Sequence, residues 1–310
     1  MPAHSGYGGG HIGGNGDVVP AEAQAKAWFG AIEFPLRGRP AKPRDVGLTM
    51  VIDKGLGIDE TRALLEVAAD YIDFIKLAFG TSVFFTPEQL REKVRLIHEY
   101  GVEVYPGGTL LEIAMVQNRL EAFDEQAQAI GFRCLEVSDG TVAMNPRYRE
   151  RLIRELVRRG FRVVSEVGKK HPADRLPNMR VREQILEDLE AGAYKVIVEG
   201  RESGKGVVIY HSDGSIDQDE LEFLASAVPD PGVLIWEAPL KNQQQDLILL
   251  FGPAVNLGNI HPQDVISLEA LRVGLRGDTL RSALLSRPQL LRVRPTWPPA
   301  VDGSGSEDWI

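Results

Sequence analysis

Eight short apolar segments, each ending in a charged residue, a glycine or an asparagine, constrain the fold of this chain more than any other feature. A stretch long enough for an amphipathic helix follows each of them, and successive segments begin about 21 to 38 residues apart. One helix between successive strands implies right-handed crossovers and a parallel sheet. No segment resembles an edge strand, so we predict an α/β fold, a closed (β/α)8 TIM barrel, over an open doubly wound sheet. The predicted strands are residues 48–53, 72–77, 103–106, 134–138, 162–166, 195–199, 233–237 and 254–257.

The chain length of 310 residues allows one or two domains, and barrels of this class form one domain of similar length. We predict a single barrel over residues 31–286. The Gly-rich residues 1–30 and the Pro-, Gly- and Ser-rich residues 287–310 have little to pack, so we predict two disordered tails.

The composition excludes several classes of partner. A net charge of −9 gives no long-range attraction for nucleic acid or an anionic membrane. The single cysteine, Cys134, excludes an intrachain disulfide and a cysteine-based metal site. No signal-peptide core or membrane-spanning apolar run is present. We therefore expect a cytoplasmic protein that binds small molecules.

Four of the predicted strands end in a glutamate: Glu136, Glu166, Glu199 and Glu237. The carboxyl ends of parallel barrel strands meet at one face, so these carboxylates should converge. Their repulsion must be relieved by lysines or by a cation, and oxygen-only ligands suit Mg²⁺. One strand-end glutamate could be a cap or an ion-pair partner, but four in matching positions predict a magnesium site.

Basic residues occur at or just after the same strand ends: Lys54, Lys76, Lys169, Lys170 and Arg201. Lys76 lies inside the apolar segment Phe74–Leu77, where an ammonium group is desolvated unless it is paired. For each of the others, a solvated surface position is an equally good explanation. Together they predict a site for a small anion.

Two turn sequences complete the predicted face. Asn256, Gly258 and Asn259 precede a helix that begins near Pro262, and backbone N–H groups at such a turn suit phosphate. Ser138, after the fourth strand, is a candidate hydrogen-bonding residue for substrate, although a turn alone explains a serine there.

These strand-end sequences resemble those of the phosphosulfolactate synthase family over about residues 37–285. The matching strings include Tyr71–Lys76, Ser165–Lys170, Glu199–Gly204 and Asn256–Ile260. The resemblance implies a homo-oligomeric (β/α)8 barrel that adds sulfite to phosphoenolpyruvate with Mg²⁺, giving 2-phospho-3-sulfolactate.

In that chemistry sulfite attacks the methylene carbon, and charge spreads into an aci-carboxylate that a cation and lysines can stabilise. Under the resemblance we expect Lys169 or Lys76, with a lowered pKa, to protonate the adjacent carbon. Lys54 and Arg201 would offset the charge of sulfite and carboxylate, and Lys170 would bind substrate. Glu136 and Glu166 would be the principal ligands of Mg²⁺, and the turn after the eighth strand would bind phosphate.

Two other functions stay open at this point. The plant heat-stress-associated 32-kDa proteins are similar in sequence but do not perform this catalysis, so the barrel could be a stress or interaction protein. An enzyme of the same enolate-forming type could also act on another small acid. The intact polar strand ends favour an enzyme, because an interaction protein would be free to lose them.

Overall fold

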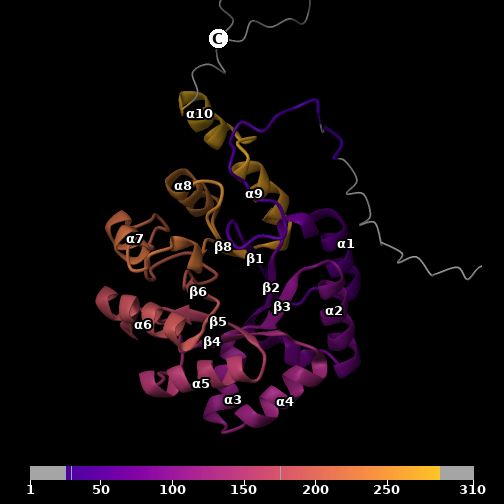
Figure 1. Cartoon of the computed structure of the whole chain (residues 1–310), viewed down its shortest axis with the longest axis vertical. Helices are drawn as coiled ribbons and strands as arrows, with labels where there is room; N and C mark the ends of the chain where they lie inside the picture. The colour runs from indigo at the N-terminus through magenta and orange to yellow at the C-terminus, as the bar shows by residue number, and fades with distance from the viewer. Residues whose placement is uncertain (1–25, 29, 175, 287–310) are drawn as a thin grey trace, which may run out of the picture. The chain divides into compact units, whose positions relative to one another are not determined.

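The computed structural model describes residues 26–28, 30–174 and 176–286, and within them the predicted barrel is confirmed (Figure 1). Eight parallel strands follow the order β3-β2-β1-β8-β7-β6-β5-β4. The strands are β1 (Thr49–Asp53), β2 (Phe74–Leu77), β3 (Glu103–Pro106), β4 (Cys134–Ser138), β5 (Arg162–Val167), β6 (Lys195–Val198), β7 (Leu234–Glu237) and β8 (Leu257–Ile260). β3 and β4 lie next to each other without a paired ladder, so the barrel is nearly closed.

Helices connect the strands along the outside of the barrel. They are α1 (Ile58–Ala68), α2 (Pro87–Glu99), α3 (Gly108–Val116), α4 (Leu120–Ile130), α5 (Pro146–Arg158), α6 (Asn178–Ala191), α7 (Gln218–Ala225), α8 (Lys241–Phe251), α9 (Val265–Arg272) and α10 (Gly277–Ser286). Local sequence sets several starts: Thr86 caps α2 by accepting from the Gln89 N–H, and Asn145 caps α5. None of these helices is both long and apolar enough to cross a membrane.

The eighth strand begins later than predicted, at Leu257 instead of residue 254. The Asn256 side chain accepts from the Leu48 N–H and donates to the Gly232 and Leu234 carbonyls, so it ties together the amino ends of neighbouring strands. Gly258 and Asn259, predicted as a turn, belong to the strand. Thr49 of β1 pairs with Leu257 and Val51 pairs with Ile260, so β8 has one extra residue between these pairs. This marks a β-bulge at Gly258 and Asn259.

Two apolar layers form the core. The larger lies between the strands and helices. The smaller fills the inside of the barrel and consists of Leu48, Met50, Phe74, Tyr105, Cys134, Val164, Ile197 and Ile235. Because inward-facing residues alternate along each strand, this inner layer separates polar groups at the carboxyl ends of the strands from those at the amino ends.

The described residues from Phe34 onward form one compact unit. The predicted domain boundaries at residues 31 and 286 stay a prediction. Of the two predicted tails, residues 1–25, 29 and 287–310 lie outside the described residues.

Candidate active site

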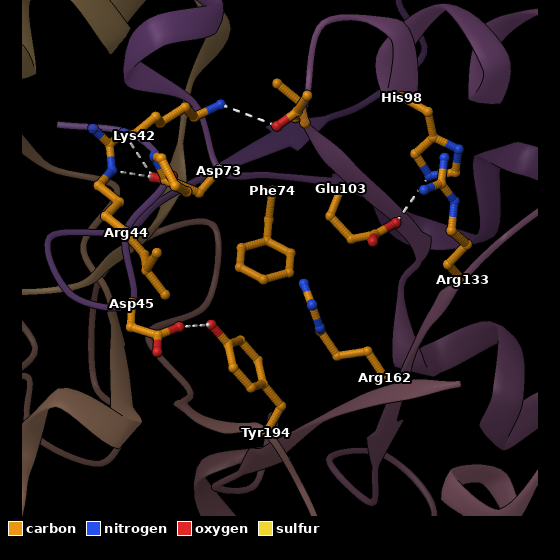
Figure 2. A pocket seen from close by; sticks show the side chains of 14 residues that line it. Lys42, Arg44, Asp45, Asp73, Phe74, His98, Glu103, Arg133, Arg162 and Tyr194 are labelled. Carbon is orange, nitrogen blue, oxygen red and sulfur yellow. Dashed lines mark hydrogen bonds and ion pairs between the residues drawn. The ribbon is translucent and has the colours of Figure 1, made fainter. Parts of the chain in front are cut away.

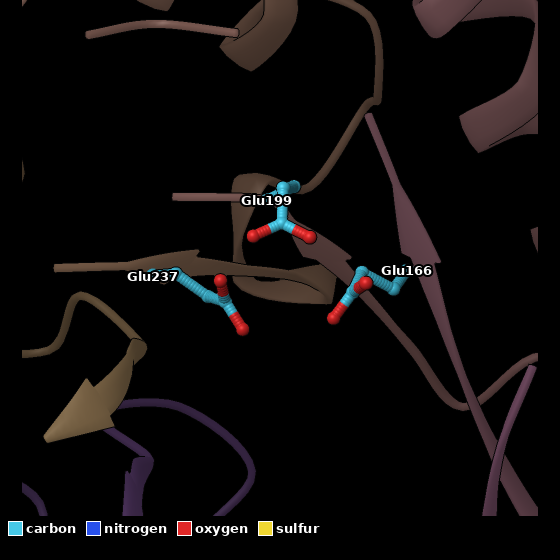
Figure 3. A group of neighbouring side chains, drawn as sticks. All are labelled: Glu166, Glu199 and Glu237. Atoms are coloured by element: carbon cyan, nitrogen blue, oxygen red, sulfur yellow. The ribbon is translucent and has the colours of Figure 1, made fainter. Parts of the chain in front are cut away.

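Four buried glutamates gather at the carboxyl ends of β4 to β7. Glu136, Glu166, Glu199 and Glu237 are each at most 2% exposed. The carboxylates of the last three point toward one another (Figure 3). Carboxyl groups packed this closely need a cation or a proton.

Lys76 supplies the central positive charge. Its Nζ lies 2.7 Å from Glu166 Oε2, 3.0 Å from Glu136 Oε2 and 3.3 Å from Glu237 Oε1. Burial alone would lower the pKa of Lys76, but the three carboxylates outweigh it and raise that pKa well above the usual value. The expectation of a lysine with a lowered pKa is therefore wrong for Lys76, whose ammonium form the three carboxylates stabilise.

Lys170 adds a second positive charge at the edge of the cluster. Its Nζ lies 3.4 Å from Glu166 Oε1 and donates to Thr109 Oγ1 at 3.1 Å. Glu166 is the main cause of a raised pKa for Lys170. About a third of this side chain is exposed, so the charge faces the mouth of the barrel.

The four carboxyl groups differ in how readily they hold a proton. Burial raises the pKa of Glu136 to about 7, against the opposing effect of Lys76. Burial, with Glu166 and Glu237 nearby, raises the pKa of Glu199 well above its usual value. Burial also opposes ionisation of Glu166, but Lys170 and Lys76 reverse that effect and lower its pKa. Ionised Glu166 thus lies beside more easily protonated neighbours.

Three of the glutamates could hold a divalent cation. One carboxylate oxygen from each of Glu166, Glu199 and Glu237 lies within 4.8 Å of the others. Glu199 Oε2 and Glu166 Oε1 are buried and accept no hydrogen bond from the described residues. Unsatisfied carboxylate oxygens in an all-oxygen cluster fit a hard cation. Glu136 is not part of this group: its Oε1 accepts from the Gly108 N–H at 2.8 Å, and its Oε2 lies 3.0 Å from Lys76 Nζ.

Gly108 explains how Glu136 is positioned. A Cβ at residue 108 would lie 2.5 Å from Ser138 Oγ and 2.7 Å from Glu136 Oε1. Only glycine therefore allows the first turn of α3 to approach β4 closely enough for its N–H to hold the carboxylate.

The structure places Lys169 and Ser138 differently from the central cluster. Lys169 Nζ donates to the Asp139 carbonyl at 2.5 Å and to its Oδ2 at 2.6 Å. Ser138 is fully buried and donates to Glu112 Oε1 at 2.5 Å. Lys169 thus has its partner in the loop after β4, and Ser138 has its partner in α3.

Two basic residues lie at the mouth. Lys54 Nζ forms an ion pair of 2.7 Å with Glu202 Oε1, and both side chains are well exposed. The Arg201 N–H donates to Glu199 Oε1 at 2.6 Å, and its backbone is left-handed, with φ 57°. The loop after β6 thereby meets both the acidic cluster and the loop after β1.

The end of β8 offers a further polar group. Asn259, in the bulge, has φ 54°, is 3% exposed, and its Oδ1 accepts no hydrogen bond from the described residues. A Cβ at Gly258 would lie 2.5 Å from Met50 Cε and 3.5 Å from Glu237 Cγ, which places this glycine against the barrel interior. The structure brings both residues to the cluster side, but it places Asn256 at the opposite end of the strand.

Sequence reasoning missed several supporting residues. Buried Glu112 accepts from the Thr141 and Val142 N–H groups as well as from Ser138. Arg149 joins Asp188 and Asp139 and donates to the Glu166 carbonyl at 2.9 Å. A lone glutamate in the apolar sequence of α3 was a usable signal for Glu112. Arg149 gave none, because it occurs among many charged residues of α5.

Comparisons with known proteins agree on one family. The model of the (2R)-phospho-3-sulfolactate synthase (ComA) family matches residues 37–278. A phosphosulfolactate synthase from Methanothermobacter thermautotrophicus is 47% identical over 253 residues, covering 81% of this chain and 97% of that protein. Those from Methanocaldococcus jannaschii and Bacillus subtilis are 43% and 38% identical, covering 75% and 80% of this chain and 93% and 97% of those proteins.

Proposed function

This chain belongs to the (2R)-phospho-3-sulfolactate synthase family, and from that premise we propose that it adds sulfite to phosphoenolpyruvate with the help of Mg²⁺. In this reaction the sulfite sulfur forms a bond to the methylene carbon, and the C=C π electrons move into the carboxylate. A proton then adds to the carbon that bears the phosphate ester. Atoms and charge balance without an oxidant or reductant.

The single observation that carries the proposal is the ring of buried carboxylates around Lys76 at the carboxyl ends of the strands. Barrel enzymes place their chemistry at this face. A site with fixed positive charge at its centre is suited to stabilise the negative charge that develops on the substrate carboxylate.

Mg²⁺ is proposed to bind Glu166, Glu199 and Glu237, whose oxygens cluster and include two without hydrogen bonds from the described residues. The cation would supply Lewis-acid stabilisation of the aci-carboxylate. Glu136, also in the predicted metal set, is held by Gly108 and is proposed to orient Lys76.

The lysines divide the remaining work in this proposal. Lys76, whose proton three carboxylates retain, stabilises charge. Lys169, whose Nζ lies 2.6 Å from Asp139 Oδ2, donates the proton to carbon. Lys170, Lys54 and Arg201 attract the anionic groups, and backbone N–H groups at the end of β8, near Gly258 and Asn259, receive the phosphate.

The test is phosphoenolpyruvate-dependent consumption of sulfite, measured with and without Mg²⁺. We expect turnover only with the metal. Lys169→Ala should lower kcat far more than the affinity for phosphoenolpyruvate, and near-normal kcat would overturn that role. Folded protein without turnover would instead support the non-catalytic, heat-stress-associated type of role, and turnover with a different small acid would support the third function.

We also propose a cytoplasmic homo-oligomer. Apolar side chains near the mouth, Phe79, Val83, Phe84 and Val116, are between 55% and 85% exposed, which is consistent with a covered surface. Sedimentation of the purified chain at several concentrations would decide: a single monomeric species at all of them contradicts the proposal.

A further inference from the structure

A second polar hollow lies at the amino ends of the strands, at the opposite end of the barrel from the glutamates (Figure 2). Its volume is about 520 Å³, within the range of small-molecule sites. The residues before β1 form one wall, and the first residues of β3 and β5 form another. Phe74 and Leu48, from the inner apolar layer, close its floor. The hollow is therefore separated from the active site by the barrel core.

The acidic side chains of this hollow already have partners. The pairs are Asp73 with Arg44 at 2.8 Å, Glu103 with His98 at 2.9 Å, and Asp45 with the Tyr194 hydroxyl at 2.6 Å. Arg44 neutralises Asp73, whereas the Tyr194 hydroxyl is a neutral donor and leaves the charge of Asp45 in the hollow. None of these acidic side chains lies at ion-pair distance from the other cations of the hollow.

Three cations remain without an acidic partner at ion-pair distance among the described residues. Arg133 and Arg162 have neither an ion pair nor a side-chain hydrogen bond there, and the Lys42 ammonium donates only to the Gly101 carbonyl at 3.3 Å. Burial lowers the pKa of Lys42, as expected for an ammonium without a close counter-ion. Glu103 accepts its side-chain hydrogen bond from His98, and Arg133 is one of the charges that lower its pKa without forming an ion pair with it.

The two arginines are placed to act together. Arg133 directly precedes β4 and Arg162 begins β5, where its N–H donates to the Arg133 carbonyl at 2.8 Å. The Arg162 guanidinium lies 4.8 Å above the Tyr194 ring and extends into the middle of the hollow, whereas Arg133 follows the wall toward His98 (Figure 2). The ring contact holds Arg162 in place without neutralising it.

We propose that this hollow is a second ligand site, which binds a small organic acid with two anionic groups. A guanidinium offers paired donors that match a carboxylate or phosphate group. Arg162 takes the group at the centre, and Arg133, on the neighbouring strand end, takes the other group. Lys42 adds positive charge from the opposite wall (Figure 2). This site goes beyond the proposed function, because the apolar core prevents a ligand there from reaching the glutamates.

The experiment is calorimetric titration of the full chain with succinate, a two-carboxylate probe, in the presence of saturating phosphoenolpyruvate. We expect the wild-type protein to bind succinate under these conditions. The double variant Arg133→Gln/Arg162→Gln should bind it at least about tenfold more weakly, since one lost charged hydrogen bond accounts for about that factor. A matched control, Arg151→Gln/Arg154→Gln, removes two exposed arginines from α5 and should bind like wild type.

Equal affinity in all three proteins, no binding by wild type, or complete displacement by phosphoenolpyruvate would overturn the proposal. Titration with inorganic phosphate in place of succinate distinguishes the two kinds of anionic group. Weaker binding of phosphate than of succinate identifies dicarboxylates as the ligands. Tighter binding of phosphate, lost in the double variant, identifies phosphate esters. Thermal unfolding of each variant verifies the fold. Sulfite consumption is measured separately, so a failure of the proposed catalysis leaves this result interpretable.

Discussion

The two ends of the barrel solve the problem of inward-facing charge in opposite ways. At the carboxyl end, buried carboxylates surround the single ammonium of Lys76 at hydrogen-bonding distance. At the amino end, Arg162 and Arg133 face an open hollow without acidic partners in the described chain. Strand β5 contributes to both, with Arg162 at its start and Glu166 near its end. The difference indicates that charges at the carboxyl end are stabilised by neighbouring charged side chains, whereas Arg162 and Arg133 at the amino end are stabilised by solvent.

Removal of the Lys76 charge should have the largest effect. Lys76→Met leaves three buried carboxylates without their shared cation, and breaking a buried ion pair in this way costs about 3–5 kcal/mol. We expect urea unfolding to show a loss of that order and sulfite consumption to disappear. Lys241→Met, which breaks an exposed pair with Asp278, should change stability far less. Equal losses in the two variants would contradict the dependence of the buried carboxylates on the Lys76 charge.

The pH dependence of stability should follow the raised pKa of Glu136. Because that pKa is about 7 in the folded protein and near 4.5 in the unfolded chain, the folded state binds more protons between these values. Stability of the metal-free protein should therefore fall as the pH rises from 5 to 8, by up to about 3 kcal/mol from this group.

Glu136→Gln should flatten that part of the profile, whereas Glu183→Gln, an exposed carboxylate on α6, should keep it. Urea unfolding at pH 5 and pH 8 measures both slopes. A Glu136→Gln profile as steep as that of wild type would assign the titration to another group.

Gly108→Ala should be the next largest change. The added Cβ meets Ser138 and Glu136 at distances that force one of them to move, and such overpacking costs about 1–3 kcal/mol. Because Glu136 would lose its N–H donor, turnover should fall as well. Gly277→Ala is the matched control, because a Cβ at this position meets open space, and it should leave turnover unchanged. Unchanged stability and turnover of Gly108→Ala would contradict the proposed role of the Gly108 N–H in holding Glu136.

The sequence was sufficient to predict the barrel and the set of strand-end residues, because periodicity and strand-end chemistry are local. It also predicted that Lys76 must be paired. It could not predict that the paired carboxylates would raise the pKa of Lys76, since that depends on three distances between strands far apart in sequence. Asn256 was predicted at the carboxyl end of the eighth strand, because the Leu-Gly-Asn sequence that follows it is typical of a turn. In the structure the bulge lets Leu257–Ile260 continue as a strand, and Asn256 precedes it.

The smallest expected effect is at the amino end, where Arg162→Gln should change stability by no more than about 0.5 kcal/mol. Arg162 is exposed and has no ion pair in the described chain, so its loss leaves no buried carboxylate uncompensated. Urea unfolding without added anions measures this value. Repetition with saturating succinate should reveal a larger loss, because the wild-type protein binds succinate more tightly than the variant and is stabilised more by it. A large loss without succinate would mean that Arg162 is structural, and the contrast between the two ends would fail.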